Sequence, residues 1–307
     1  MNKKSRHLWA AKIYGCFIAV LQRKKKFQQW LQQGYDRFIC TPDRLACQPS
    51  RKIRTGERKI SVAIPHWNRG GLIHRPLWNI IHDERVEEIV IVDDGSSEEE
   101  FALLVKNVAQ YDRRKIVTIH RREENRGAQF TKIECVEKTT GAWMILLDSD
   151  NTLLPSYLNI VATLENLEEQ KIYCPDWAFP YFCFHQLSGE QIDFQRACQL
   201  TKKGVLQRVY ILNDGNYFFH RNSYLTHLLS LKDMHPDAAD VMTTSYHWLS
   251  QGGFLEVLRG APYIHRVDAS SFWIRTSEKS RKRVMTIFDR LEKKIPWDDA
   301  FQNTLIK

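Results

Sequence analysis

The pattern of apolar and polar positions changes near residue 60. Before this point basic and apolar residues are mixed, and after it short apolar runs alternate with stretches of helical spacing. Four short runs predict buried strands at residues 60–65, 88–92, 116–120 and 143–147. The stretches between them predict helices at residues 71–82, 97–110 and 127–139. This order predicts an α/β fold with a mostly parallel sheet flanked by helices on both faces.

The first 33 residues combine lysine and arginine with aromatic and aliphatic residues at partly helical spacing. Two interpretations stand side by side: a basic amphipathic helix on an anionic membrane surface, or a helix packed on the main domain with a solvated basic face. The apolar run between Lys12 and Arg23 has ten residues, where about 20 are needed to cross a bilayer. We therefore expect neither a spanning helix nor, without a small-residue cleavage site, a signal peptide.

These patterns divide the chain of 307 residues into three parts. Residues 1–59 are a basic N-terminal helical extension that ends in a polar linker at 41–59. Residues 60–275 are the α/β domain, with halves at 60–152 and 153–275. Residues 276–307 are a C-terminal helical segment, with a helix expected at 276–294.

Composition and charge narrow the class of protein. Apolar residues make up 43% and charged residues 26%, as in ordinary globular proteins. The net charge is +9, but residues 1–59 hold 15 Lys and Arg against 3 Asp and Glu, whereas the remainder holds 30 against 33. Because the main domain is slightly acidic, we expect no nucleic-acid binding. The seven cysteines form no C-x-x-C pair, which favours reduced thiols in a cytoplasmic protein.

Candidate chemistry follows the predicted strands. PHWNR comes after the first strand, DDGSS after the second and DSDN after the fourth. Ligands bind at the carboxyl ends of such strands, and paired acids there suit Mg²⁺ or Mn²⁺, which prefer carboxylate oxygens. A purely local role is also open, in which Gly95 supplies a positive φ and Ser96 or Ser97 caps the next helix.

Together these motifs resemble those of the inverting family 2 glycosyltransferases with the GT-A fold. The resemblance rests on ISVAIPHWNR, EIVIVDDGSS and Asn125-Arg126-Gly127, followed by GAW and LLDSDN. It covers residues 60–152 and continues more weakly to about residue 275. It implies a GT-A fold, a nucleotide-sugar donor, most readily a UDP-sugar, and a divalent metal, Mn²⁺ or Mg²⁺.

The resemblance also implies roles for individual donor-side residues. Asp93 or Asp94 falls where the family holds the uracil of the donor, and Asp148 falls near the ribose. Lys132 stands where the family usually has arginine, and Ile133 where it has asparagine. The remaining positions with roles toward the nucleotide or its metal are Pro65, Asn68, Asp150 as metal ligand, His265 as a further metal ligand and Arg266 facing the diphosphate.

The acceptor half carries the candidate general base. Asp240 falls where the family has its catalytic acid, although Ala239 replaces the glutamate that usually precedes it, and Asp237 is the alternative. Either acid could instead stabilise a helix N-terminus. In the aromatic stretch CPDWAFPYFCFH, Asp176 and Trp177 are candidates for acceptor binding, with core packing as the other interpretation.

The expected function is sugar transfer to a glycan or lipid-linked acceptor, in a setting such as capsule or lipopolysaccharide assembly. The expected location is the cytoplasm, with peripheral contact to the inner face of the membrane through residues 1–33. One alternative is a non-catalytic GT-A-like module that binds a glycan or partner. A sugar nucleotidyltransferase is disfavoured, because PHWNRGG lacks a lysine-bearing phosphate loop.

Overall fold

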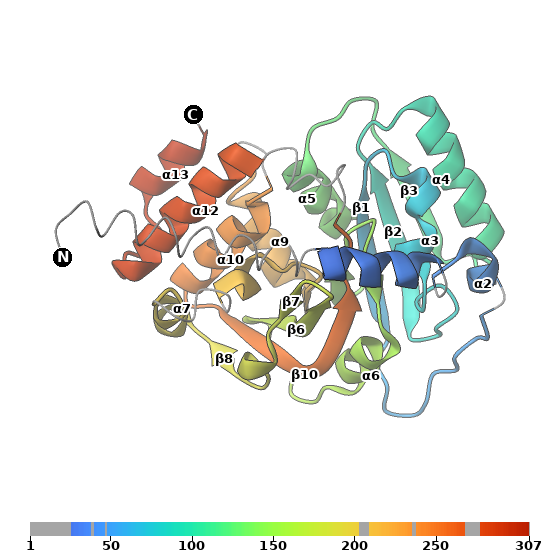
Figure 1. The fold of residues 1–307 in the computed structure, drawn as a ribbon, viewed down its shortest axis with the longest axis horizontal. Coiled ribbons are helices and arrows are strands. Elements are labelled where there is room, and N and C mark those ends of the chain that lie inside the picture. Colours follow the sequence, from blue (N-terminus) through green and yellow to red (C-terminus); the bar gives the residue numbers. More distant parts are fainter. Residues whose placement is uncertain are drawn as a thin grey trace.

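The computed structural model describes residues 26–37, 40–46, 48–202, 209–234, 238–267 and 277–306 (Figure 1). In these ranges one sheet of ten strands has the order β3-β2-β1-β4-β9-β6-β10-β5, with β7 on β6 and β8 on β10. The strands are β1 Ile60–His66, β2 Val86–Asp93, β3 Val117–Arg121, β4 Trp143–Leu146, β5 Thr152–Leu153, β6 Lys171–Phe179, β7 Phe182–Cys183, β8 Gln191–Ile192, β9 Phe218–His220 and β10 Phe254–Ile264.

The first four strands form the parallel half of the sheet. β1 pairs in parallel with β2 and β4, and β2 pairs in parallel with β3. β9 lies antiparallel between β4 and β6, and β6 is again parallel to the long strand β10. The predicted α/β fold with a mostly parallel, helix-flanked sheet is confirmed. All four predicted strands are present, so the loops that follow β1, β2 and β4 open at one edge of the sheet.

Helices cover both faces of this sheet (Figure 1). Along β1, Val62 and Ile64 join the hydrophobic core that α2, α3, α4 and α6 close, whereas Ala63 joins the core closed by α5, α7, α9, α10, α12 and α13. This alternation follows from the two-residue period of a strand. The helices are α2 Pro42–Ala46, α3 His74–Leu77, α4 Glu98–Tyr111, α5 Ala128–Lys138, α6 Pro155–Thr163, α7 Phe194–Leu200, α9 Arg221–Leu229, α10 Asp240–Ser250, α12 Ser277–Glu292 and α13 Asp299–Ile306, with 3₁₀ turns η1 Gly70–Leu72, η2 His185–Leu187 and η3 Tyr210–Asn213.

Three predicted helices are found as α4, α5 and α12, but the one expected at residues 71–82 is wrong. The chain there forms only η1 and α3, and Asn79 has a φ of 66°, a conformation that ends a helix. A distant contact holds Asn79 in place, because its side-chain Nδ2 donates to the Leu153 carbonyl at 2.8 Å. Helical spacing of apolar residues could not reveal this tertiary hydrogen bond.

A helix at residues 26–37, dark blue in Figure 1, lies against the α/β domain. Gln28 Nε2 donates to the Pro180 carbonyl at 2.9 Å, and Tyr181 Oη donates to Gln32 Oε1 at 2.7 Å. Further along the chain, the Arg58 amide donates to the Ala162 carbonyl at 2.9 Å, which holds the predicted linker against the domain. Residues 1–25 of the basic extension lie outside the described residues. Within the described ranges, no helix has the length and apolar character needed to cross a bilayer.

Candidate active site

The loops after β1 and β2 are joined by buried polar side chains. His66 Nδ1 lies 2.8 Å from Asp93 Oδ1, and Ser96 Oγ donates to the same oxygen at 2.5 Å. Burial opposes the charge of Asp93, but these hydrogen bonds lower its pKa below the ordinary value. Asn68 completes the junction, since its amide donates to Ser96 Oγ at 2.7 Å and its Oδ1 accepts from the Ser97 amide at 2.9 Å. Asp93 and Asn68 therefore shape the loops by bonds within the protein.

Asp94 holds the next loop in the same way. Its carboxylate accepts from the backbone amides of Arg126 at 2.9 Å and Gly127 at 2.8 Å, and from the Arg122 guanidinium at 3.0 Å. Gly95 has a φ of 67°, and a Cβ there would come 2.7 Å from the backbone nitrogen of the loop before α5. This close approach brings the second and third sequence motifs together. The sequence predicts that Ser96 or Ser97 caps the helix. Ser97 is the N-cap of α4, since its side chain accepts a hydrogen bond from the Glu100 amide.

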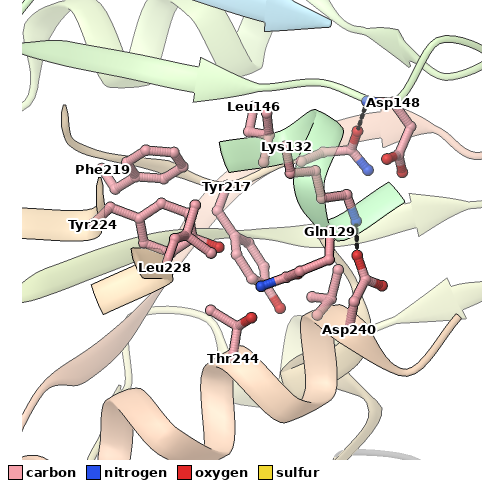
Figure 2. A pocket seen from close by; sticks show the side chains of 13 residues that line it. Gln129, Lys132, Leu146, Asp148, Tyr217, Phe219, Tyr224, Leu228, Asp240 and Thr244 are labelled. Atoms are coloured by element: carbon pink, nitrogen blue, oxygen red, sulfur yellow. Dashed lines mark hydrogen bonds and ion pairs between the residues drawn. The ribbon is translucent and has the colours of Figure 1, made fainter. Parts of the chain in front are cut away.

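Lys132 and Asp240 form an ion pair beside the acids that follow β4. Lys132 Nζ on α5 lies 2.5 Å from Oδ2 of Asp240, the first residue of α10 (Figure 2). Burial works against the charge of Lys132, but Asp240 and Asp148 raise its pKa above the ordinary value. The pKa of half-buried Asp148 is raised by burial and by Asp150 and Asp240, against the opposing effect of Lys132. Three carboxyl groups thus share one site with a lysine that stays charged.

The candidate metal ligands Asp150 and His265 are within range of an electrostatic interaction. Asp150 forms an ion pair with Arg69 of the loop after β1. Burial lowers the pKa of His265 to about 4, although Asp150 acts to raise it, so the imidazole is neutral at pH 7. Neutral imidazole and carboxylate are both good ligands for Mn²⁺.

These donors fit a divalent ion held by two side chains. No cluster of three or more His, Cys, Asp or Glu in metal-binding arrangement occurs in the described ranges. A metal at Asp150 and His265 would complete its coordination with oxygens of substrate and water, as Mg²⁺ commonly does. The Arg69 side chain would have to leave the carboxylate first.

Two side chains, Tyr263 and Asp214, form a series of hydrogen bonds that ends at His265. Tyr263 Oη lies 3.1 Å from His265 Nδ1 and 3.0 Å from Asp214 Oδ1. Burial and the neighbouring charge of Asp148 raise the pKa of Asp214 well above its ordinary value, against the effect of the Tyr263 hydrogen bond. Because Tyr263 occupies Nδ1, the ring nitrogen left to bind a metal is Nε2.

The candidate acceptor residues Asp176 and Trp177 make contacts within the protein. Asp176 is buried, and its Oδ2 accepts from the Ser188 hydroxyl at 2.9 Å and from the Gly260 amide at 2.8 Å. Trp177 packs edge-on against Phe179 and His185. These contacts tie both candidates into the protein around β6. The remaining candidates are Pro65, which pairs with Val92 inside the sheet, Arg266, whose amide donates to Asn151 Oδ1 at 3.0 Å, and Asp237, which lies outside the described residues.

A small pocket, partly open to solvent, lies beside the Lys132–Asp240 pair (Figure 2). α5, α9, α10 and the ends of β4 and β9 form its walls. Its lining residues are Gln129, Lys132, Leu146, Asp148, Gly215, Asn216, Tyr217, Phe219, Tyr224, Leu228, Asp240, Val241 and Thr244.

The structure brings three residues to the site that the sequence motifs do not single out. Arg69 lies within the PHWNR motif, and Gln129 lies one helical turn before Lys132. The sequence could therefore have indicated that both residues lie near the site. Tyr263 has none, because its partner Asp214 is 49 residues away.

The comparisons with known proteins agree with this geometry. Residues 61–192 match the family model described as glycosyl transferase family 2. A strand-edge cluster of acids on a sheet of this topology defines the class, a protein with the GT-A fold of glycosyltransferases. The matched region is similar to family 2 glycosyltransferases, and the resemblance inferred from the motifs is confirmed.

Solved structures share the fold at low sequence identity. TarS of S. aureus in complex with UDP-GlcNAc is 14% identical with a TM-score of 0.55, over 81% of this chain and 70% of that one. GalNAc-T7 with UDP, GalNAc and Mn²⁺ is 15% identical with a TM-score of 0.53, over 86% of this chain and 58% of that one. The mannosyltransferase PcManGT of Pyrobaculum calidifontis, with GDP-Man and Mn²⁺, is 14% identical with a TM-score of 0.51, over 88% of this chain and 74% of that one.

Two curated relatives match a shorter region. An uncharacterized protein of Mycobacterium tuberculosis is 35% identical over 104 residues, which are 34% of this chain and 31% of the relative. An uncharacterized glycosyltransferase of Mycoplasma pneumoniae is 29% identical over 109 residues, which are 34% of this chain and 36% of the relative. The chain thus spans about a third of the length of each curated relative it matches.

Proposed function

We propose that this protein is an inverting, metal-dependent glycosyltransferase that moves a sugar from a UDP-sugar to a hydroxyl of a glycan or lipid-linked acceptor. The observation that carries the proposal is the convergence of Asp148, Asp150 and Asp240 with Lys132 at the carboxyl edge of the parallel strands. The nucleotide sugars and Mn²⁺ bound in the structural neighbours support the choice of substrate and metal class. The biological setting we propose is assembly of a surface polysaccharide.

The reaction needs one displacement at the anomeric carbon. The acceptor oxygen forms a bond to this carbon while the bond from the carbon to the diphosphate oxygen breaks, which inverts the configuration. Asp240 takes the proton from the acceptor hydroxyl as the new bond forms. Lys132 must release Asp240 for this step, and the negative diphosphate of the donor is a competing partner for the lysine.

Asp150 and His265 are the residues that would hold the metal. A bound divalent cation would stabilise the negative charge that develops on the leaving diphosphate. With a metal bound there, Arg69 would leave Asp150 and would be available to contact the diphosphate, whose anionic oxygens bind a guanidinium as a carboxylate does. Asp148 and the loops held by Asp93 and Asp94 position the nucleotide.

We also propose peripheral contact with the inner face of an anionic membrane through the N-terminal extension. Phe27 and Trp30 on the helix at 26–37 are 59% and 65% exposed, and their stacked rings have centroids 5.9 Å apart. The basic residues that surround them in the sequence complement anionic lipid. The double variant Phe27→Ser with Trp30→Ser should lose co-flotation with phosphatidylglycerol vesicles, whereas Leu229→Ser, at another exposed apolar position, should not. Equal flotation of both variants would refute the contact.

The decisive experiment is thermal unfolding with UDP, GDP and dTDP, each with and without Mn²⁺. A ligand at about 100 times its dissociation constant stabilises the fold by about 2.7 kcal/mol. A Mn²⁺-dependent shift with UDP, followed by transfer from UDP-sugars, is the expected result. A shift with GDP or dTDP in place of UDP would indicate that the donor sugar is carried by that nucleotide. No shift with any of them would favour the alternative, a non-catalytic glycan- or partner-binding module in which Lys132 keeps Asp240 neutralised.

A further inference from the structure

A buried loop at residues 213–217 connects η3 with β9, and we call it the connecting loop. Asp214, Asn216 and Tyr217 are all buried there. Connecting segments usually run over the surface, because buried polar groups need partners within the protein. Gly215 and Asn216 have φ values of 75° and 54°, a left-handed conformation that glycine and asparagine tolerate best. The partners of the polar side chains in this loop therefore indicate what the loop holds.

Asn216 holds the backbone at Asp148. Its Oδ1 accepts from the Asp148 amide at 3.0 Å and from Asn151 Nδ2 at 3.4 Å. Tyr157 Oη donates to the Asn216 carbonyl at 2.8 Å, which fixes Asn216 in turn. Asn151 Nδ2 also donates to Asp148 Oδ2 at 3.1 Å. The Asn216 side chain thus helps to set where the Asp148 carboxylate lies after β4.

Asn213 caps the N-terminus of α10. The residue at the N-cap position is Ala239, and alanine has no side-chain oxygen with which to accept from the first amides of the helix. Asn213 Oδ1 accepts from the amide of Met242, the third residue of α10, at 3.0 Å. A cap that usually comes from the preceding residue is supplied here from 29 positions away. Because Asp240 is the first residue of α10, this bond fixes the turn that carries the proposed base.

The connecting loop lies between the two elements that it holds. A Cβ at Gly215 would come 3.8 Å from Asp148 Oδ2 and 3.8 Å from Val241 Cγ2 on α10. Asp214, the preceding residue, begins the series of hydrogen bonds that ends at His265. Three polar residues within four positions thus hold the loop after β4, the start of α10 and the end of β10.

We infer that the connecting loop is a shared positioning element of the active site, in which Asn216 positions Asp148 and Asn213 positions Asp240. Neither asparagine needs to touch the substrate, since each acts through the backbone of the residue that does. This inference rests on the proposed function and deepens it by adding two positioning residues to the proposed reaction.

The two asparagines should act on different steps of the reaction. Asp148 is proposed to contact the nucleotide, so loss of the Asn216 side chain should weaken nucleotide binding. Asp240 is proposed to take a proton from the attacking hydroxyl, so loss of the Asn213 cap should slow the cleavage of bound donor. A general loss of stability would not divide between binding and rate in this way.

The test measures UDP affinity by calorimetry with Mn²⁺, and the release of UDP from UDP-glucose and UDP-N-acetylglucosamine with water as the acceptor. Asn216→Gly keeps the left-handed backbone but loses the side chain, and should bind UDP about tenfold more weakly. Asn213→Ala should keep UDP affinity within about threefold and cleave the donor about tenfold more slowly. Asn213→Asp keeps the oxygen acceptor and should restore the rate. Asn166→Gly, at an exposed position with a φ of 53°, is the matched control and should change neither quantity.

The outcomes separate this inference from the proposed function. Wild-type UDP affinity in Asn216→Gly, or a wild-type cleavage rate in Asn213→Ala, would overturn the inference. Equal losses of affinity and rate in both variants would also overturn it and leave the loop as a structural connection. If Asn216→Gly does not fold, Asn216→Asp, which places a negative charge beside Asp148, should weaken UDP binding in its place.

The wild type itself tests the proposed function. If it binds no nucleotide, the proposed function fails, and the inference fails with it. If it binds UDP but cleaves neither donor with water, the comparison of UDP affinity decides: Asn216→Gly must lose affinity and Asn213→Ala must keep it.

Discussion

Lys132 and Asp240 are 108 residues apart in the sequence, yet Nζ and Oδ2 lie 2.5 Å apart at the centre of the site. The pair links α5 to α10. An arginine fork, which the family usually has at this position, would reach a carboxylate through two parallel bonds, whereas lysine offers a single point charge that can move between partners. The pair therefore suits a lysine that exchanges Asp240 for the donor diphosphate.

The pair should matter for stability as well as for chemistry. Lys132→Met leaves the carboxylate of Asp240 buried without its cation, and we expect the free energy of unfolding to fall by about 3 kcal/mol. Lys132→Met combined with Asp240→Leu should recover much of this loss, because both charges are gone. Urea denaturation of both single variants and the double variant measures the coupling. Purely additive effects would show that the two side chains do not interact in solution.

Asp240→Asn separates binding from transfer. The amide keeps the size of the side chain but cannot accept the acceptor proton as a base. We expect UDP affinity to change by less than about threefold, whereas transfer falls by about 10²-fold or more. Titration with UDP and a single-turnover transfer assay check the two parts. Normal transfer by this variant would move the base to another residue, with Asp237 the next to test.

Arg69 forms an ion pair with Asp150, the proposed metal ligand, and would compete with a metal for this carboxylate. Arg69→Gln removes this competitor, so the variant should bind Mn²⁺ without nucleotide about tenfold more tightly than the wild type, by electron paramagnetic resonance of free Mn²⁺. Asp150→Asn should abolish binding. Arg44→Gln, at an exposed position on α2, serves as the matched control for loss of a positive charge. Equal Mn²⁺ affinity of Arg69→Gln and the wild type would show that the ion pair does not guard the carboxylate.

Buried histidines should make the fold sensitive to acid. Burial lowers the pKa of His227 to about 3 and that of His247 to about 4, and the two rings contact each other between α9 and α10. An unfolded chain has ordinary histidines with a pKa of about 6.5. Between pH 4 and 6.5 the unfolded chain therefore binds more protons at these residues than the folded one, so their contribution to stability is lost as the pH falls through this window.

The variant His247→Asn tests this contribution. We expect the free energy of unfolding to fall less steeply from about pH 6.5 to about pH 5 than in the wild type, measured by urea titration at each pH. His120→Asn, at a half-buried position on β3 outside this cluster, is the control and should keep the wild-type slope. The same slope in all three proteins would contradict a neutral buried His247.

Local sequence patterns were sufficient to predict the parallel half of the sheet and the loops that carry its chemistry. The runs that became β1, β2 and β4 are mostly apolar, as expected of strands covered on both faces, and the acids that follow β2 and β4 had to lie at one edge. This rule about the carboxyl ends of parallel strands was sufficient to predict that Asp148 and Asp150 lie at that edge. Positive φ at Gly95 and the cap at Ser97 are local effects too, and both were predictable.

Only the tertiary structure decided which groups meet across the site. The contact of Lys132 with Asp240 depends on how α10 packs beside α5, and the hydrogen bond from the Asp148 amide to Asn216 joins residues 68 positions apart. Asn79 ends a helix through a hydrogen bond to a residue 74 positions away, and Asp176 turns toward β10. Periodicity along a chain records which face of an element is buried, but the partner of a buried polar group comes from segments that are distant in sequence.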